Sequence, residues 1–147
     1  MRRISVLFVL LSLFVVAEGL SAQDSGPPTS SGQANGFQLI QNYPNPFNPE
    51  TTIPFILGED LFVDGRPALV SVRIFNLLQQ LVASPVALGH PTGDGIEVVQ
   101  LEYAQPGRFE AFWNGTDQSG RQVASGIYLV QLTVNGISKT RKMFVLK

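Results

Sequence analysis

The segment that decides the fold is Asn42-Tyr43-Pro44-Asn45-Pro46-Phe47-Asn48-Pro49-Glu50-Thr51, which continues as Thr52-Ile53-Pro54-Phe55-Ile56-Leu57. Its first three prolines fix their own φ angles and push the residues before them toward extended backbone, which excludes a helix. We therefore expect a stiff extended arm that leads into a β-strand over 51–57. Because Pro54 cannot donate a backbone hydrogen bond, we expect this strand at the edge of a sheet.

Further along the chain, short runs of alternating apolar and polar residues are separated by turn residues, which favours strands. We expect strands near 70–74, 81–85, 96–101, 108–113 and 127–134. The dipeptide Asn135-Gly136 predicts a tight hairpin that joins the last of these to 137–146. Seven or eight short strands predict an all-β protein with an antiparallel β-sandwich. The expected core residues are Ile53, Phe55, Val72, Ile74, Trp113, Tyr128 and Leu132.

The N-terminal residues read as a secretory signal peptide over 1–22. Arg2 and Arg3 precede an apolar run over 4–17, and Ala22 supplies a small residue before a cut at Gln23. Residues 23–36 hold no large apolar side chain and are rich in Gly, Ser and Pro, which predicts a flexible linker. One folded domain is expected over 37–147, and the chain is expected to be exported.

Composition excludes several classes of function. Without Arg2, Arg3 and Glu18, the 10 basic and 11 acidic residues become 8 and 10, a formal net charge of −2. Nucleic-acid binding needs a basic excess and is not expected. The chain has no Cys and one His, so thiol catalysis, His-based triads and His/Cys metal sites lack their components. We expect no enzyme, no cofactor and no small-molecule substrate.

Five motifs in order resemble one family. These are the arm with its strand to Leu57, the strand ending Ile74-Phe75-Asn76, the turn 113–120, the pair Gly126 and Tyr128, and the basic ending Lys142-Met143 to Lys147. Together they resemble the type A C-terminal sorting domain of type IX secretion, whose Ig-like sandwich is shared with the flagellar hook-capping protein. The chain departs from the family at Gln79, where a Gly is usual. A left-handed backbone there would be strained.

The resemblance implies a non-catalytic module that directs a protein across the outer membrane and attaches it to the cell surface. Its implied partners are the outer-membrane secretion machinery and a passenger protein. The alternative is a structural adaptor of the hook-cap type that binds envelope or appendage subunits. Recognition would use the arm or the edge of the last strand. The candidate residues are Tyr43, Pro44, Asn45, Pro46, Phe47, Asn48, Pro49, Gly126, Tyr128, Lys139, Arg141, Lys142 and Lys147.

Some roles have two interpretations in the sequence. Tyr43 and Phe47 either fasten the arm to the sandwich, which is favoured, or are presented to a receptor. The four basic residues near the C-terminus either protect a strand edge or attract a translocon. Asp117 and its neighbours form an Asx-type turn or supply oxygens to calcium, and the turn is favoured. His90 is interpreted as a polar loop residue.

Overall fold

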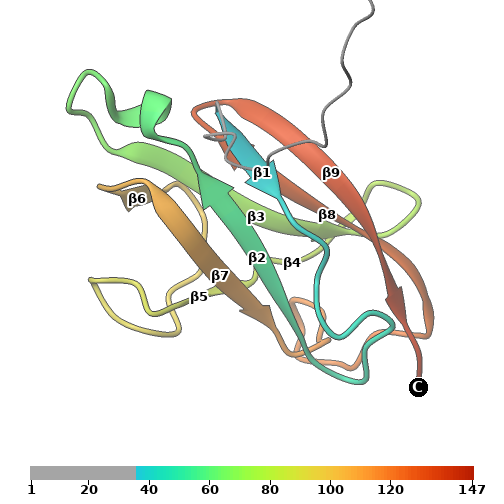
Figure 1. The fold of residues 1–147 in the computed structure, drawn as a ribbon. Helices are drawn as coiled ribbons and strands as arrows, with labels where there is room; N and C mark the ends of the chain where they lie inside the picture. The colour runs from blue at the N-terminus through green and yellow to red at the C-terminus, as the bar shows by residue number, and fades with distance from the viewer. Residues whose placement is uncertain (1–35) are drawn as a thin grey trace, which may run out of the picture. The chain divides into compact units, whose positions relative to one another are not determined.

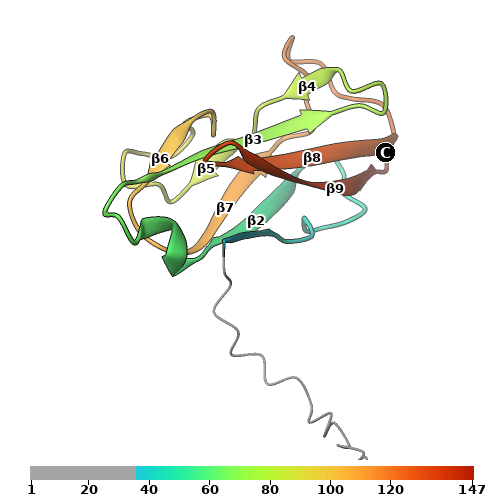
Figure 2. The ribbon, with the colours of Figure 1, turned by 90° about the horizontal axis from the view of Figure 1, so that it is seen from above.

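The computed structural model describes residues 36–147, so the expected signal peptide and nearly all of the expected linker lie outside the described part. Two antiparallel sheets face each other (Figures 1 and 2). In spatial order, sheet A contains β1 (Phe37–Leu39), β2 (Thr51–Leu57), β7 (Gly107–Trp113) and β5 (Val86–Leu88). Sheet B contains β4 (Leu81–Ala83), β3 (Ala68–Phe75), β8 (Gly126–Val134) and β9 (Ile137–Val145), and β6 (Leu101–Tyr103) pairs with the start of β3.

The predicted all-β, antiparallel sandwich is confirmed, with nine strands among residues 36–147. A short 3₁₀ helix, η1 (Glu59–Phe62), interrupts the connection between β2 and β3. The strands alternate as their sequences predict, so their inward residues form one core between the sheets. Ile53, Phe55, Val72, Ile74 and Leu132 are fully buried there, and Trp113 is 3% exposed. Tyr128 is only partly buried and packs against this core from one end of the sandwich.

The expectation that β2 is an edge strand is wrong. β2 lies between β1 and β7. Pro54 is tolerated because its carbonyl accepts a hydrogen bond from the Ile40 amide at 3.0 Å, just beyond the last residue of β1. Since the nitrogen and carbonyl of one strand residue point to the same side, the missing donor of Pro54 faces a position where β1 has already ended.

The strand expected over 96–101 is also displaced. Residues 96–98 make hydrogen bonds with the β5 side of sheet A, from the Ala87 amide to the Ile96 carbonyl and from the Val98 amide to the Pro85 carbonyl. The Val98 carbonyl then accepts from Val72 in sheet B. This segment crosses between the sheets, and the regular strand β6 begins only at Leu101.

Two turns contain non-glycine residues with a left-handed backbone. Asn135 and Gly136 have φ angles of 49° and 85°, and they join β8 to β9 as the Asn-Gly signal predicts. Gln79 has a φ of 61°, so this residue adopts the left-handed backbone that glycine tolerates better. Five hydrogen bonds link Asn76 to that turn. The Asn76 side-chain oxygen accepts from the amides of Leu78 and Gln80, and its carbonyl accepts from the Gln79 amide. The Asn76 amide and side-chain nitrogen donate to the carbonyl and side-chain oxygens of Gln80.

Candidate recognition site

The segment Asn42–Thr51, here called the proline loop, is closed on itself rather than extended. The Tyr43 amide donates to the Thr52 carbonyl and the Thr52 amide to the Tyr43 carbonyl, both at 2.9 Å. Inside the loop, the buried Asn42 side chain donates to the Pro44 carbonyl at 3.1 Å and to Thr51 Oγ1 at 2.9 Å. The expected extended arm is therefore wrong, because these hydrogen bonds join the two ends of the segment. The peptide bonds before Pro44, Pro46 and Pro49 are cis.

The tip of the proline loop pairs with the C-terminal strand. The Phe47 amide donates to the Phe144 carbonyl at 2.9 Å, and the Leu146 amide donates to the Phe47 carbonyl at 3.0 Å. The Phe144 amide donates to Asn45 Oδ1 at 3.0 Å. These contacts occupy outward-facing backbone groups at the end of β9, so the loop covers that part of the sheet edge.

Phe47 and Tyr43 have different roles. The Phe47 ring is 1% exposed and meets the Trp113 ring edge-on at 5.4 Å between centroids, so Phe47 fastens the loop to the core. The Tyr43 ring is 48% exposed, and its hydroxyl donates to Glu110 Oε1 at 2.6 Å. That hydrogen bond to a carboxylate raises the pKa of Tyr43. Tyr43 and the exposed prolines 44, 46 and 49 form the outer surface of the loop.

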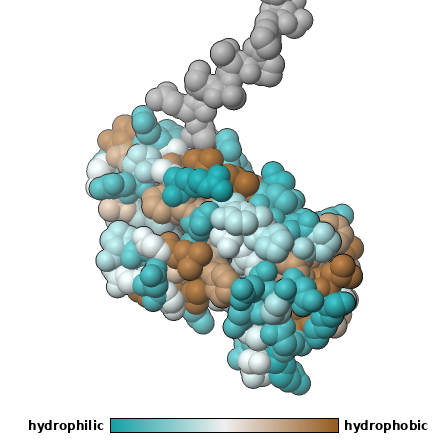
Figure 3. Space-filling view, turned by 60° about the horizontal axis from the view of Figure 1, so that its bottom comes forward, coloured by the Kyte–Doolittle hydropathy of each residue, from teal (hydrophilic) through white to brown (hydrophobic). Residues whose placement is uncertain are grey.

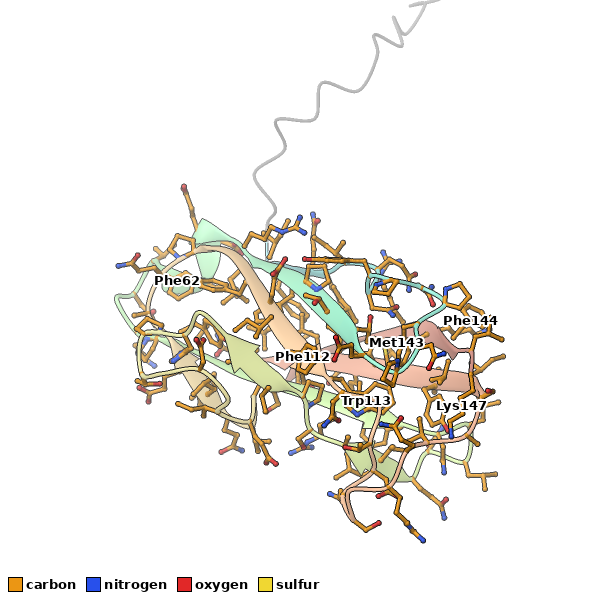
Figure 4. All side chains as sticks on the ribbon, turned by 90° about the horizontal axis from the view of Figure 1, so that it is seen from below. Phe62, Phe112, Trp113, Met143, Phe144 and Lys147 are labelled. Atoms are coloured by element: carbon orange, nitrogen blue, oxygen red, sulfur yellow. The ribbon has the colours of Figure 1, made fainter. Side chains whose placement is uncertain are left out.

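The turn after β7, which contains Gly115 and Thr116, packs against the proline loop at Pro49. A Cβ atom on Gly115 would lie 2.1 Å from the Pro49 carbonyl oxygen, so only glycine allows this approach. The Trp113 indole donates to the Thr116 carbonyl at 2.9 Å, and its ring also meets Tyr128 at 5.8 Å. In Figure 4, Trp113 and Met143 lie inside the molecule, whereas Phe144 and Lys147 lie at the C-terminal margin. Motifs from four parts of the sequence therefore meet at one end of the sandwich.

Two of the motif residues stand beside this junction. The Tyr128 hydroxyl donates to the Ala124 carbonyl at 3.0 Å, and partial burial raises the pKa of Tyr128. Gly126 is exposed, has a φ of 150°, and begins β8 opposite Val145.

Asp117 organises its turn by accepting hydrogen bonds. Its Oδ1 accepts from the Ser119 hydroxyl at 2.6 Å, the Ser119 amide at 2.9 Å and the Arg121 amide at 3.0 Å, and its Oδ2 pairs with Arg121 Nε at 3.3 Å. The Ser119 hydrogen bond is the main reason that the pKa of Asp117 falls to about 2. Calcium would have to displace these donors and lie beside a guanidinium group. The geometry is that of an Asx-type turn.

The four basic residues near the C-terminus divide into two pairs. Lys139 and Arg141 are exposed but extend from β9 toward β1, where the Lys139 ammonium donates to the Phe37 carbonyl and Arg141 Nε donates to the Leu39 carbonyl at 2.6 Å. The Lys139 ammonium also lies 4.7 Å from the centroid of the Phe37 ring. These two side chains tie β1 of sheet A to β9 of sheet B. Lys142 and Lys147 are exposed, and their ammonium groups make no hydrogen bond or ion pair within residues 36–147.

His90 is a buried structural residue, which sequence reasoning missed. It is 7% exposed, with Nδ1 2.6 Å from Thr92 Oγ1 and Nε2 2.9 Å from the Glu102 carbonyl oxygen. Its ring lies edge-on to Tyr103, at 4.8 Å between centroids. Within the described part of the chain, no group of three or more His, Cys, Asp or Glu side chains could hold a metal ion. No helix in that part is long and apolar enough to cross a membrane.

Two solved structures from Porphyromonas gingivalis are similar to this chain. One is dimeric latent PorU, with 21% identity, a TM-score of 0.48, and coverage of 75% of this chain and 9% of PorU. The other is PorZ, described as an essential surface component of the type IX secretion system, with 22% identity, a TM-score of 0.42, and coverage of 82% of this chain and 13% of PorZ. The chain thus spans a small part of either protein. No protein-family model and no curated protein matches it.

Proposed function

We propose that residues 37–147 form a non-catalytic sorting and surface-anchoring module, recognised by the outer-membrane machinery of type IX secretion after export by the signal peptide 1–22. The observation that carries this proposal is the pairing of the proline loop with residues 144–146. Two motifs of the family resemblance, about a hundred positions apart, thereby build one composite surface. A receptor that binds this surface can contact both motifs at once only when the domain is folded.

Recognition uses the exposed side of the proline loop. Tyr43 and its neighbouring prolines lie outward, while Phe47 and Asn42 hold the loop in place from within. A surface whose backbone is already fixed loses little entropy when a partner binds. The regular edge of β9 is a weaker candidate at this end, because the loop already occupies the backbone groups of Phe144.

The test is display of a reporter inserted between the signal peptide 1–22 and residues 23–147, in a host that has the type IX machinery. The intact domain is expected to carry the reporter to the cell surface. Tyr43→Ser removes a half-exposed ring and is expected to leave the reporter in the periplasm. Val63→Ser, at an 85% exposed side chain in another loop, is the matched control and should be displayed normally.

Far-ultraviolet circular dichroism and thermal melting must show that both variants are folded. A folded Tyr43→Ser variant that is displayed like the intact domain would remove the loop from recognition. If the intact domain itself leaves its reporter in the periplasm, the sorting function is refuted, and a hook-cap-type adaptor becomes the better interpretation.

A further inference from the structure

The outer face of sheet B is unexpectedly apolar near the C-terminus. In β8, Val130, Leu132 and Val134 point inward as expected, but Ile127 and Leu129 point outward. Outward residues on an antiparallel sheet are usually polar when that side meets water. Eight apolar side chains gather at this end, and we call them the leucine face: Phe75, Leu77, Leu78, Leu81, Ile127, Leu129, Phe144 and Leu146.

Strand register places these side chains next to one another. Phe75 of β3 pairs with Leu81 on one side and with Leu129 on the other. Ile127 pairs with Phe144. The β3–β4 turn, with Leu77 and Leu78, lies at the same end of the sandwich as the C-terminus (Figures 1 and 2). Figure 3 shows hydrophobic surface among hydrophilic atoms at this end.

The charged side chains on this face have one sign. β3, β8 and β9 contain no Asp or Glu. Arg73 and Lys142 point outward beside the apolar residues, opposite Gln131 and Leu129, and Lys147 follows Leu146. The cationic groups of these three residues form no ion pair within residues 36–147. The face thus combines apolar side chains with unpaired positive charge.

We propose that the leucine face docks on an anionic lipid surface. The most exposed members lie at its margins, with Leu78 at 79%, Leu146 at 61% and Leu77 at 60%, whereas Phe75 and Leu129 between them are partly buried. Leucines on a projecting turn and at a chain end can insert into a lipid surface, because lipids move aside. A rigid protein partner would instead favour a leucine face whose central residues are the most exposed. Long basic side chains beside them reach lipid phosphates, and the two attractions add. This inference goes beyond the sorting function and does not depend on it.

Co-sedimentation with vesicles tests the proposal on the chain from Gln23 onward, because residues 1–22 carry their own apolar run. Mixed phosphatidylglycerol and phosphatidylcholine vesicles are expected to bind it, and pure phosphatidylcholine vesicles to bind it more weakly. Leu77→Ser/Leu78→Ser should lower the partition coefficient by about tenfold or more, because leucine transfer from water is favourable. Lys142→Gln/Lys147→Gln removes two of the three cationic groups and should clearly weaken the preference for anionic vesicles, and added salt should also weaken it.

The matched control is Val63→Ser/Val99→Ser, which removes two exposed valines (85% and 41%) outside the face and should leave binding unchanged. Failure of the unaltered chain to bind anionic vesicles would overturn the proposal, as would equal binding by the leucine variant. If the unaltered chain does not bind vesicles but associates with itself in analytical ultracentrifugation, and the leucine variant does not associate, the face is an interface with a second copy of the chain. If the unaltered chain does not bind vesicles and the leucine variant loses surface display, the leucine face binds a protein partner.

Discussion

At the scale of single residues, comparing substitutions at two glycines distinguishes the cost of backbone strain from the cost of a steric clash. Gly115 and Gly120 have φ angles of 74° and 79°, but only Gly115 has a neighbour where a Cβ would be, the Pro49 carbonyl oxygen. Gly120→Ala is expected to cost about 1–2 kcal/mol of unfolding free energy from the left-handed backbone alone. Gly115→Ala must also displace the proline loop, so urea denaturation should show a clearly larger loss. Equal losses would mean that the loop yields without cost.

Asp117 predicts a pH dependence of stability. Its pKa is about 2 in the folded chain against 3.8 ordinarily, so the folded state favours the ionised form. The resulting stabilisation is complete above 3.8 and is lost as the pH falls through 3.8 toward 2. The stability difference between the unaltered chain and Asp117→Asn should shrink over that window, as measured by denaturation at several pH values. A carboxyl signal titrating near 3.8 in nuclear magnetic resonance would contradict this.

Sequence reasoning identified positions whose role depends on their own neighbours in the chain. Trp113 follows from the alternation of β7, and the left-handed turn at Asn135 and Gly136 from residue type. The sequence favoured the fastening role for both Tyr43 and Phe47, but it could not separate the two residues, because the burial of Phe47 depends on the distant Trp113 and Phe144. His90 was missed since its partners, Thr92 and the Glu102 carbonyl, give no pattern in the sequence.

At the scale of strands, the two pairs of basic residues predict different losses. Lys139→Gln/Arg141→Gln removes charged hydrogen bonds to the β1 carbonyls and should cost about 1–2 kcal/mol, after allowance for solvent exposure. Hydrogen exchange of the β1 amides should rise with it. Lys142→Gln/Lys147→Gln removes surface charge alone and should change stability by less than about 0.5 kcal/mol. Equal effects of the two pairs would refute the tie between β1 and β9.

Strands could be identified from their alternating residues where one face of the sheet is buried and the other is exposed to solvent. The prediction failed at Pro54, because the sequence does not reveal that β1 ends beside it. It failed again over 96–101, where the chain leaves one sheet for the other and alternation no longer describes a single strand. The alternation of β8 was recognisable in the sequence, but its outward positions Ile127 and Leu129 are apolar, and both belong to the leucine face.

At the scale of the whole molecule, we predict that the exported chain begins at Gln23, because Ala22 supplies the small residue that signal peptidase requires. Mass spectrometry of the exported protein measures this directly. A membrane-bound chain that keeps Met1 would contradict export by cleavage. The sandwich was predictable from strand spacing, but the meeting of the motifs was not, since it depends on pairing between distant segments.

The junction between Asn45 and Phe144 also sets an order of events during folding. Its partners are separated by 99 positions, so the proline loop leaves the ribosome long before the strand that completes it. Such long-range pairing is slow to form and cannot begin until the far segment is present. A chain that stops short of Phe144 would leave Phe47 without its backbone partners. The proline loop can therefore make all its hydrogen bonds only in a chain that has been synthesised through residues 144–146.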